Sequence, residues 1–230
     1  MNLPSAFLTR MQEMLGEEYE AFLQSYESGH YQSLRLNPRK TDREEFMEKS
    51  PFHLTPVAWE KNGFYYSEED TPGKHPYHEA GVYYIQEASA MAPVGYLDVQ
   101  PGDYVLDLCA APGGKTILLA EQMQGTGTLY SCDAAENRVG LIRTAVDRMG
   151  FTGVHTLCND ATKPNPALPM ADRILTDVPC SGLGILAKKP DLRYKKLDPA
   201  RQAELLATQA AILDTAARLL KAGGRLVYST

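Results

Sequence analysis

One motif in this sequence brings together side chains that could catalyse a reaction. The run DVPCSG at residues 177–182 carries a carboxyl group at Asp177 and a thiol at Cys180, with Pro179 stiffening the turn between them. The apolar residues before it predict a buried strand that delivers both groups to the ligand-binding edge of a sheet. A lone cysteine at a strand end is usually structural, but a carboxyl group and a thiol this close together suit acid–base or nucleophilic chemistry.

A second motif, DLCAAPGGKT at residues 107–116, has the composition of a ligand-binding turn between a strand and a helix. Gly113 and Gly114 would let a ligand approach the backbone closely. The start of the helix would offer free N–H groups and the positive end of its dipole. Lys115, at that helix start, would lie near enough to pair with Asp177. A tight turn without any ligand is the plainer interpretation.

Two kinds of nucleotide-binding protein use such a turn. A phosphate-binding loop reads GxxxxGK[ST], and Gly114, Lys115 and Thr116 match its end. Its first glycine would fall at Cys109, so the phosphate-loop motif is incomplete. The other kind of protein binds the amino-acid end of a nucleoside cofactor at this turn. The motif by itself leaves both possibilities open.

Two further acidic residues follow the next predicted strands. Asp133 ends the second strand, 20 residues after Gly113, where an acid can accept hydrogen bonds from ribose hydroxyls. An acid that caps the following helix would look the same. Asp160 follows the third strand, where it could bond an adenine amino group or simply stabilise a turn. Together with the Gly-rich turn, Asp133 favours a nucleoside cofactor over a bare phosphate.

The elements that position these residues begin at about residue 84. From there, strands alternate with helices of ten or more residues, which predicts βαβ crossovers and a parallel sheet. The predicted strands are 104–110, 127–133, 153–160, 173–180 and 224–230, and the predicted helices are 86–99, 113–123, 135–150 and 199–224. Ligands of such sheets bind at the carboxyl ends of the strands, where all four cysteines also fall.

The first part of the chain has a different pattern, which combines helix periodicity with turn-forming composition. The predicted elements are a core-facing helix at 5–27, a strand at 33–37, a charged helix at 41–49 and a loop at 61–80. The loop is rich in glycine, proline, histidine and acidic residues, so we place a domain boundary in it. This gives an N-terminal region of residues 1–75 and a second domain of residues 76–230.

Composition excludes several classes of protein. The chain has 230 residues, of which 43% are hydrophobic and 23% charged, and this is not the composition of a disordered, collagen-like or membrane protein. No apolar run approaches the roughly 20 residues that span a bilayer, and no signal peptide begins the sequence. The four cysteines form no CxxC pair, so we expect no bound metal and reduced thiols in the cytoplasm.

Charge is divided unevenly along the chain. The net charge of −6 is concentrated in residues 1–90, which carry 8 basic and 15 acidic residues, whereas residues 91–230 carry 15 and 14. The stretch 188–201 carries 6 basic and 2 acidic residues. Such a patch can bind phosphates although the whole chain is acidic, and the alternative is a solvated loop. The candidate phosphate-binding residues are Lys188, Lys189, Arg193, Lys195 and Lys196.

Taken in order, these motifs resemble those of the Nop/Sun family of RNA (cytosine-5)-methyltransferases. The resemblance is carried by GVYYIQEASAM at residues 81–91, DLCAAPGGKT, the turn at Asp133, DVPCSG and the closing GRLVYST at 224–230. It covers residues 81–230 closely. The preceding segment with SLRLN is more loosely similar to the N-terminal RNA-binding region of the family. Within the family, the sequence most resembles the bacterial small-subunit rRNA methyltransferases of the F type.

The resemblance implies an α/β protein with the Rossmann-like parallel sheet of class I methyltransferases and a small α+β RNA-binding region before it. It also implies S-adenosylmethionine (SAM) as methyl donor. The cofactor loop would comprise Cys109, Ala110, Ala111, Pro112, Gly113, Gly114 and Lys115. Asp133 would hold the ribose, Asp160 the adenine, and Asp177 the methionine end and the target base. The basic stretch after DVPCSG would contact RNA, with rRNA of the small ribosomal subunit as the expected partner and no membrane.

The resemblance assigns roles to two cysteines. In the family one lies in the DVPCSG motif, here Cys180, and the other follows a YST strand end and attacks carbon 6 of cytosine. This addition makes the ring enamine-like, so that carbon 5 can accept the methyl group. The sequence stops at Thr230, so we expect a sheet truncated after its fifth strand and an inactive fragment of a longer protein. Cys180, Asp177 and Lys115 are the expected catalytic residues.

Four alternatives stay open from the sequence. The substrate could be tRNA, or the loop could belong to a phosphate-loop NTPase with Asp177 as its magnesium-binding acid. In a DNA or small-molecule methyltransferase of the cytosine-5 type, Cys180 itself would be the nucleophile. A non-catalytic RNA-binding module is the fourth, although the acidic N-terminal region argues against it. Calorimetry with SAM would separate the methyltransferases from the rest.

Overall fold

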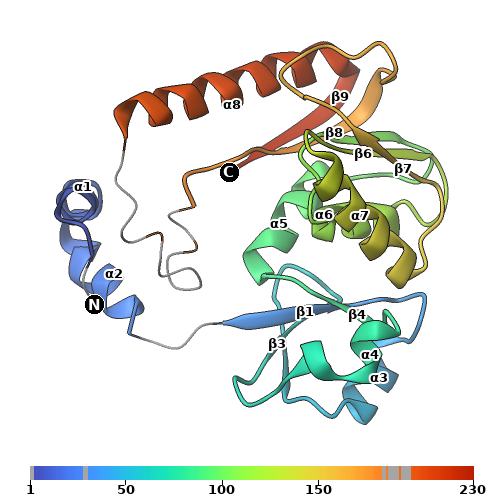
Figure 1. Ribbon diagram of the computed structural model, residues 1–230. Helices are drawn as coiled ribbons and strands as arrows, with labels where there is room; N and C mark the ends of the chain where they lie inside the picture. Colours follow the sequence, from blue (N-terminus) through green and yellow to red (C-terminus); the bar gives the residue numbers. More distant parts are fainter. Residues whose placement is uncertain (1–2, 28–30, 183–184, 186–191, 193–197) are drawn as a thin grey trace. The chain divides into compact units, whose positions relative to one another are not determined.

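The computed structural model describes residues 3–27, 31–182, 185, 192 and 198–230. The chain divides into two compact units, each described by itself. The first unit combines residues 1–30 with 180–206, and the second combines residues 31–179 with 207–230. Figure 1 labels most of the helices and strands of both units, and all described strands belong to the second.

The larger sheet of the second unit is parallel throughout, with the strand order β7-β6-β5-β8-β9. Its strands are β5 Tyr104–Asp107, β6 Thr128–Asp133, β7 Val154–Cys158, β8 Ala171–Asp177 and β9 Leu220–Ser229. Because β5 lies in the middle, the direction of chain order reverses beside it. Ligands of open parallel sheets bind outside the carboxyl ends of the strands at such a reversal. The parallel sheet of five strands predicted from the sequence is confirmed.

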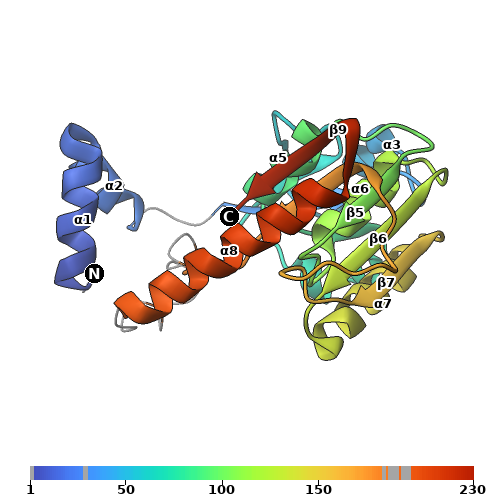
Figure 2. The same ribbon diagram turned by 90° about the horizontal axis from the view of Figure 1, so that it is seen from above.

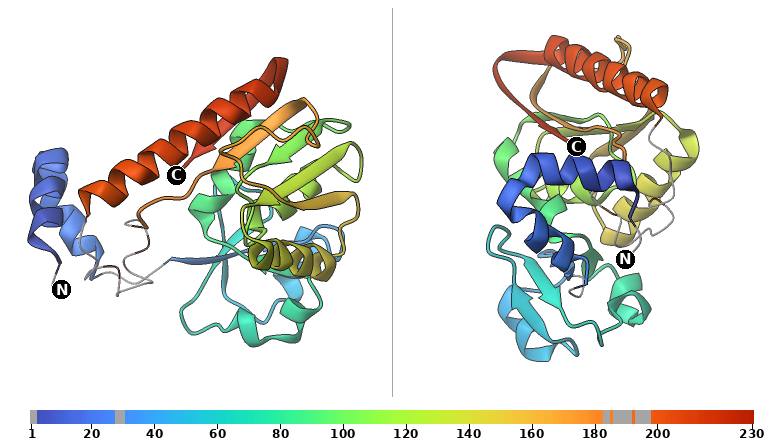
Figure 3. Two further views of the ribbon diagram at one scale, coloured as in Figure 1. Left: turned by 45° about the horizontal axis from the view of Figure 1, so that its top comes forward. Right: turned by 90° about the vertical axis from the view of Figure 1, so that its left-hand side faces the viewer.

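Helices cover both faces of this sheet because successive strand residues point to opposite sides (Figures 2 and 3). Val105 packs with α5, α6 and α7 in one buried cluster, whereas Leu106 packs on the opposite face with the part of α8 that follows residue 206. These helices are α5 Ala88–Leu97, α6 Gly114–Gln122, α7 Glu136–Met149 and α8 Pro199–Leu219, whereas α3 Arg43–Lys49 and α4 Pro76–Glu79 lie beside the smaller sheet. Burial of these two apolar clusters holds the helices in fixed positions around the strand ends.

The smaller sheet of the second unit is antiparallel, with the strand order β2-β3-β1-β4. Its strands are β1 Gln32–Leu36, β2 Leu54–Pro56, β3 Gly63–Tyr66 and β4 Tyr83–Ile85, and β1 confirms the predicted strand at 33–37. One face buries Leu34 and Phe64 against Phe46 of α3. On the other side of the sheet, α5 contacts β1 and β3 (Figure 1). The small sheet is therefore packed directly onto the domain with the parallel sheet.

The described part of the first unit consists mainly of α1 Ser5–Leu15, α2 Tyr19–Ser25 and the first turns of α8. The single helix predicted for residues 5–27 is wrong, because a 3-10 turn at Gly16–Glu18 separates α1 from α2. Gly16 ends α1 with a φ of +51°, a backbone conformation that favours glycine. Of the described residues in these two helices only Phe7 is buried. The other residues of the predicted core-facing stripe are partly buried, except Met14, which is exposed.

Two other predicted elements are wrong at their bounds. The predicted loop at 61–80 contains β3, whose aromatic residues pair with β1 and β2 although the flanking composition is that of a loop. The helix predicted for 199–224 ends at Leu219, and Gly224 lies within β9. A Cβ at Gly224 would lie 2.9 Å from the backbone oxygen of Asp172, so the glycine permits close strand packing and does not end the helix.

Candidate active site

The loop between β5 and α6 forms the first part of the site, at the carboxyl edge of the parallel sheet. Gly113 enters α6 with a φ of +110°, which favours glycine, and its N–H donates to the backbone oxygen of Ala110 at 2.8 Å. The N–H of Ala110 donates to the oxygen of Cys132 at 2.8 Å and ties the loop to β6. No side chain among the described residues caps α6, so the N–H groups of its first turn are available to an anionic ligand group.

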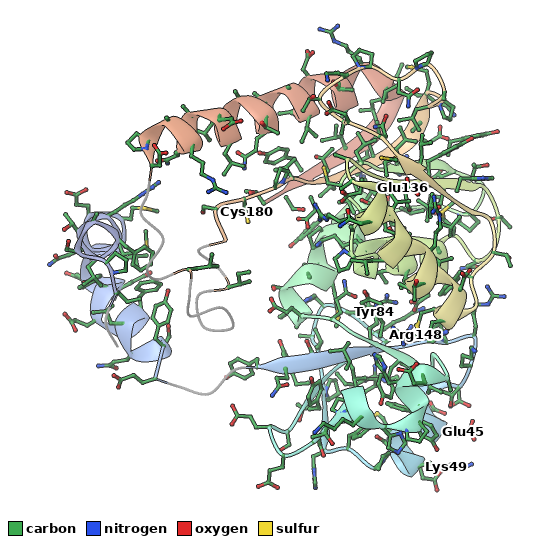
Figure 4. The ribbon with its side chains drawn as sticks, in the orientation of Figure 1. Glu45, Lys49, Tyr84, Glu136, Arg148 and Cys180 are labelled. Carbon is green, nitrogen blue, oxygen red and sulfur yellow. The ribbon has the colours of Figure 1, made fainter. Side chains whose placement is uncertain are left out.

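Gly113 and Gly114 also allow close packing within the protein. A Cβ on Gly113 would lie 3.3 Å from the Cβ of Ala145 on α7. A Cβ on Gly114 would lie 3.0 Å from Cε1 of Tyr84, which Figure 4 labels. Both glycines therefore let neighbouring elements contact the start of α6. The close approach of a ligand to the same backbone stays a prediction.

Lys115, the second residue of α6, contacts the end of β8. Its Nζ donates to Asp177 Oδ2 at 2.7 Å, and Ser229 Oγ of β9 donates to Asp177 Oδ1 at 2.7 Å. The structure thus brings Lys115 and Asp177 together, as the sequence predicts. The Asp177 side chain is 34% exposed, so a ligand can reach it. The sequence motifs assign no role to Ser229. The feature that could have indicated one is the YST sequence at the end of the last predicted strand.

Asp107, the last residue of β5, is fully buried. Its Oδ2 accepts a hydrogen bond from Thr116 Oγ1 at 2.8 Å, and its Oδ1 has no hydrogen-bond partner within the described ranges. Burial raises the pKa of Asp107 to about 7, although the Thr116 hydrogen bond and the charge of Lys115 oppose this effect. A buried acid that titrates near neutral pH and interacts with Lys115 is a candidate functional residue. In the sequence, the position of Asp107 at the end of an apolar predicted strand is the feature that could have indicated this role.

Asp133 ends β6 beside the same loop and is 4% exposed. Its Oδ1 accepts from the N–H of Ala135 at 3.3 Å, and Arg138 Nη2 lies 3.3 Å from its Oδ2. Arg138 also donates to the backbone oxygen of Ala111 in the loop at 3.2 Å. Because these contacts are long, the carboxylate keeps the capacity to accept hydrogen bonds from hydroxyl groups. Arg138, which no sequence motif singles out, links the loop to the predicted ribose-binding acid.

Comparison with known proteins now identifies the family. Residues 94–230 match the family described as "16S rRNA methyltransferase RsmB/F", and residues 3–88 match the "N-terminal domain of 16S rRNA methyltransferase RsmF". The chain belongs to the RsmB/F family. This finding confirms the resemblance to Nop/Sun-type rRNA methyltransferases that the motifs predict.

Individual RsmB/F relatives and neighbouring structures agree with this assignment. "Ribosomal RNA small subunit methyltransferase F" of Escherichia coli O157:H7 is 36% identical over 239 aligned positions, which cover 99% of this chain and 50% of the relative. The crystal structure of a methyltransferase homolog protein from Pyrococcus horikoshii is 31% identical with a TM-score of 0.83, covering 98% of this chain and 72% of that one. The chain thus spans about half the length of the curated relative.

A more distant structure supports the RsmB/F fold. NSun6 from Pyrococcus horikoshii, crystallised with SFG, has a TM-score of 0.85 at 20% identity and covers 98% of this chain and 82% of that chain. The shared architecture is the class I methyltransferase fold, with its parallel sheet and helices on both faces. The predicted fold class is confirmed, together with the additional N-terminal region.

Asp160, which the resemblance assigns to the adenine, accepts hydrogen bonds within its own turn. Its Oδ1 accepts from the N–H and the Oγ1 of Thr162 at 3.0 and 2.6 Å, and Lys163 Nζ lies 3.0 Å from its Oδ2. These contacts, led by the Thr162 side chain, lower the pKa of Asp160 to about 2. The geometry is that of a turn-stabilising aspartate, and contact with adenine stays a prediction.

The four cysteines differ in exposure. Cys132 is buried and Cys109 is partly buried, whereas Cys158 and Cys180 are exposed. Burial raises the pKa of both Cys109 and Cys132 to about 12, so neither forms a thiolate readily at neutral pH. Cys180 is the first residue of segment 180–206 in the first unit, and Figure 4 labels it. Along the chain it follows Asp177 of the second unit by three residues.

Other predictions concern RNA, metals and membranes. The candidate RNA contacts Lys188, Lys189, Arg193, Lys195 and Lys196 lie outside the described residues. Within the part of the chain that the structure describes, no group of three or more His, Cys, Asp or Glu side chains is arranged to hold a metal ion. In the same part, no helix combines the length and the apolar character needed to cross a membrane.

Proposed function

We propose that this protein transfers a methyl group from SAM to carbon 5 of a cytosine in RNA. The observation that carries the proposal is the cluster of Lys115, Asp177 and Ser229 at the carboxyl edge of the parallel sheet, at the uncapped start of α6. Membership of the RsmB/F family supports the reaction type. The cluster supplies a carboxyl group, held by Lys115 and Ser229, where parallel sheets bind their ligands.

The residues at this edge fit SAM. A carboxylate suits the free N–H groups at the start of α6, and ribose hydroxyls suit Asp133, whose own hydrogen-bonding contacts are long. The loop Cys109–Lys115 would hold the amino-acid end, Asp133 the ribose and Asp160 the adenine. When bound, SAM supplies an electrophilic methyl group. The protein has to hold it in line with the target carbon and to manage the protons of the base.

Asp177 is the residue we assign to the proton of the target base. Both of its oxygens accept hydrogen bonds, from Lys115 Nζ and from Ser229 Oγ, each at 2.7 Å, and these contacts hold the carboxyl group at the edge of the sheet. In its acid form, Asp177 would donate a proton to the ring nitrogen while a thiolate forms a bond to carbon 6. Carbon 5 would then use the electron pair of its double bond to carbon 4 to form the bond to the methyl group, which would leave the SAM sulfur with the electron pair of the broken bond remaining on sulfur. A base would then remove the carbon-5 proton, so that the double bond between carbons 5 and 6 re-forms as the thiolate leaves, and the ring nitrogen would return its proton to Asp177.

We assign the attack on carbon 6 to a cysteine that follows the YST sequence and a late role in product release to Cys180. In the full-length protein, Cys180→Ala should still attack the cytosine and receive the methyl group but should release the product slowly. A covalent protein–RNA adduct should then accumulate and survive denaturing electrophoresis. If Cys180 is the nucleophile, the same variant forms no adduct.

For the substrate we propose rRNA of the small ribosomal subunit, methylated in the cytoplasm. The name of the 36% identical relative specifies this RNA, and the family description specifies 16S rRNA. Nothing comparable favours tRNA. A phosphate-loop NTPase loses its support, because Cys109 stands where the loop requires glycine and the family is one of methyltransferases.

Bisulfite sequencing of RNA from cells with and without the gene tests this function. We expect one cytosine of small-subunit rRNA to lose its methyl group in the deletion strain and to regain it when the gene is restored. A loss of cytosine methylation confined to tRNA would show that the substrate is tRNA and not rRNA. If no cytosine changes in either RNA, the proposed reaction is wrong.

A further inference from the structure

Arg35 of β1 is fully buried, although arginine is among the residue types that rarely lose contact with water. Its three guanidinium nitrogens have three different partners. Nε donates to Gln86 Oε1 at 3.2 Å, Nη2 donates to the backbone oxygen of Gly114 at 3.4 Å, and Nη1 forms an ion pair with Glu121. The side chain therefore reaches from the small antiparallel sheet to the helix that follows the candidate SAM loop.

Gly114 and Glu121 stand near opposite ends of α6. Gly114 is its first residue and Glu121 its last but one, about two helical turns apart. Helical side chains tilt toward the N-terminus, so the Glu121 carboxylate extends along the helix toward the guanidinium that contacts Gly114. Two contacts this far apart along one helix restrain its movement along its own axis more effectively than either contact alone.

The partner Glu121 is itself held in place. Asn62 Nδ2 donates to Glu121 Oε1 at 2.9 Å, and the Asn62 N–H donates to Glu60 Oε1 at 3.1 Å. Burial lowers the pKa of Arg35 to about 10, a shift that Glu60 opposes, so the guanidinium stays protonated at neutral pH. A buried ion pair adds little net stability, but removal of one partner leaves the other charge buried and unpaired. The ion pair between Arg35 and Glu121 therefore strongly favours one position of α6.

We propose that Arg35 is a positioning residue that fixes α6 along its axis and thereby places its first N–H groups and Lys115 at the SAM site. The inference rests on the proposed function for the identity of the ligand and on the contacts of Arg35 for the positioning. Being fully buried, Arg35 does not belong to an RNA-binding surface. Asn37 of the same SLRLN sequence is also fully buried, and its Nδ2 donates to the backbone oxygens of Gly81 and Met149.

The test compares Arg35→Lys with Asn37→Ala in the 230-residue chain. Lysine keeps the charge that pairs with Glu121 but lacks the planar fork that also reaches Gln86 and Gly114. Asn37 is the matched control because it is equally buried but contacts the end of α7. We expect Arg35→Lys to accelerate amide hydrogen exchange at residues 113–118 roughly tenfold and to weaken SAM binding by a similar factor. Asn37→Ala should change neither, even where both variants lower the melting temperature.

Hydrogen exchange is measured without a ligand and so separates this inference from the proposed function. Unchanged exchange at 113–118 in Arg35→Lys, or equal acceleration in Asn37→Ala, would overturn the positioning role. A wild-type chain that does not bind SAM would overturn the proposed function, while the exchange comparison still decides the role of Arg35. If Arg35→Lys does not fold, Arg35→Met combined with Glu121→Gln removes both charges and keeps an acceptor for Asn62, and the same comparison applies.

Discussion

Lys115 Nζ lies 2.7 Å from Asp177 Oδ2, although 62 positions separate the two residues in the chain. The contact exists because α6 follows β5, and β8, which ends at Asp177, is hydrogen-bonded directly to β5. Parallel strands bring the residues that follow them to one edge of the sheet. The order of the strands therefore brings Lys115 and Asp177 together at the candidate site.

Replacement of Lys115 should separate catalysis from binding. In the full-length protein we expect Lys115→Met to lower the rate of methyl transfer roughly a hundredfold, because Asp177 loses a contact that holds its carboxyl group in place. Calorimetry should show a much smaller loss of SAM affinity. Lys49→Met is the matched control, since Lys49 lies exposed on α3 with Glu45 as its partner (Figure 4). A methylation rate close to that of the control would remove Lys115 from the mechanism.

Asp133→Ala should weaken SAM binding. Hydrogen bonds from ribose hydroxyls to a charged acceptor contribute roughly 1.5–3 kcal/mol each, so we expect an affinity loss of about tenfold or more by calorimetry. Glu136→Ala is the control, because Glu136 lies three residues along the chain, is exposed and pairs with Arg143. An unchanged dissociation constant in Asp133→Ala would show that the ribose is held elsewhere.

Local patterns predict part of this structure and miss the rest for identifiable reasons. The strand at β5 and the loop to Gly113 follow from apolar runs and glycine, which act over short distances. The pairing of Arg35 with Glu121 joins residues 86 positions apart, and charged side chains normally indicate solvent exposure. The same applies to Arg138, whose contact with Ala111 depends on the packing of α7. Such contacts follow from the tertiary arrangement and carry no local signal.

The raised pKa of Asp107, about 7 through burial, predicts a pH effect on stability. In the unfolded chain this acid ionises near its usual pKa of about 3.9, so between about pH 4 and pH 7 the folded protein holds a proton that the unfolded chain has lost. The stability that Asp107 contributes therefore falls as the pH rises through this window. Asp107→Asn keeps an acceptor for Thr116 and does not titrate. As the pH rises from about 4.5 to about 8, the melting temperature of the wild type should therefore fall relative to that of Asp107→Asn.

The matched control for this titration is Asp172→Asn. Asp172 accepts hydrogen bonds from the Tyr104 N–H and from Lys221, which lower its pKa. Both its folded and unfolded forms are then ionised above about pH 5, so this variant should differ from the wild type by a nearly constant amount above that pH. A constant difference for Asp107→Asn as well would show that Asp107 does not titrate near neutral pH.

Thiol alkylation should distinguish the cysteines. At about pH 8, a thiol with a pKa near 12 holds only on the order of one thiolate in ten thousand, so Cys109 and Cys132 should react very slowly with iodoacetamide. Cys158 and Cys180 are exposed and should react first, as peptide mass spectrometry would show. Unfolding in urea is the control and should make all four react alike. Rapid labelling of Cys109 in the folded chain would contradict the burial that raises its pKa.

The basic stretch after DVPCSG should contact the RNA backbone. Each phosphate contact contributes about 0.7 to 0.9 to the slope of log affinity against log salt concentration. Changing Lys195 and Lys196 together to alanine should therefore lower that slope by roughly 1.4 to 1.8 and weaken binding of different RNA sequences equally. Alanine at Arg143 and Arg218 removes the same charge from two exposed helix positions and should leave the slope almost unchanged, because both arginines lie outside the basic stretch and outside the predicted N-terminal RNA-binding region. Equal slopes for the two double variants would mean that Lys195 and Lys196 lie in a solvated loop, since a change in net charge alone affects both variants alike.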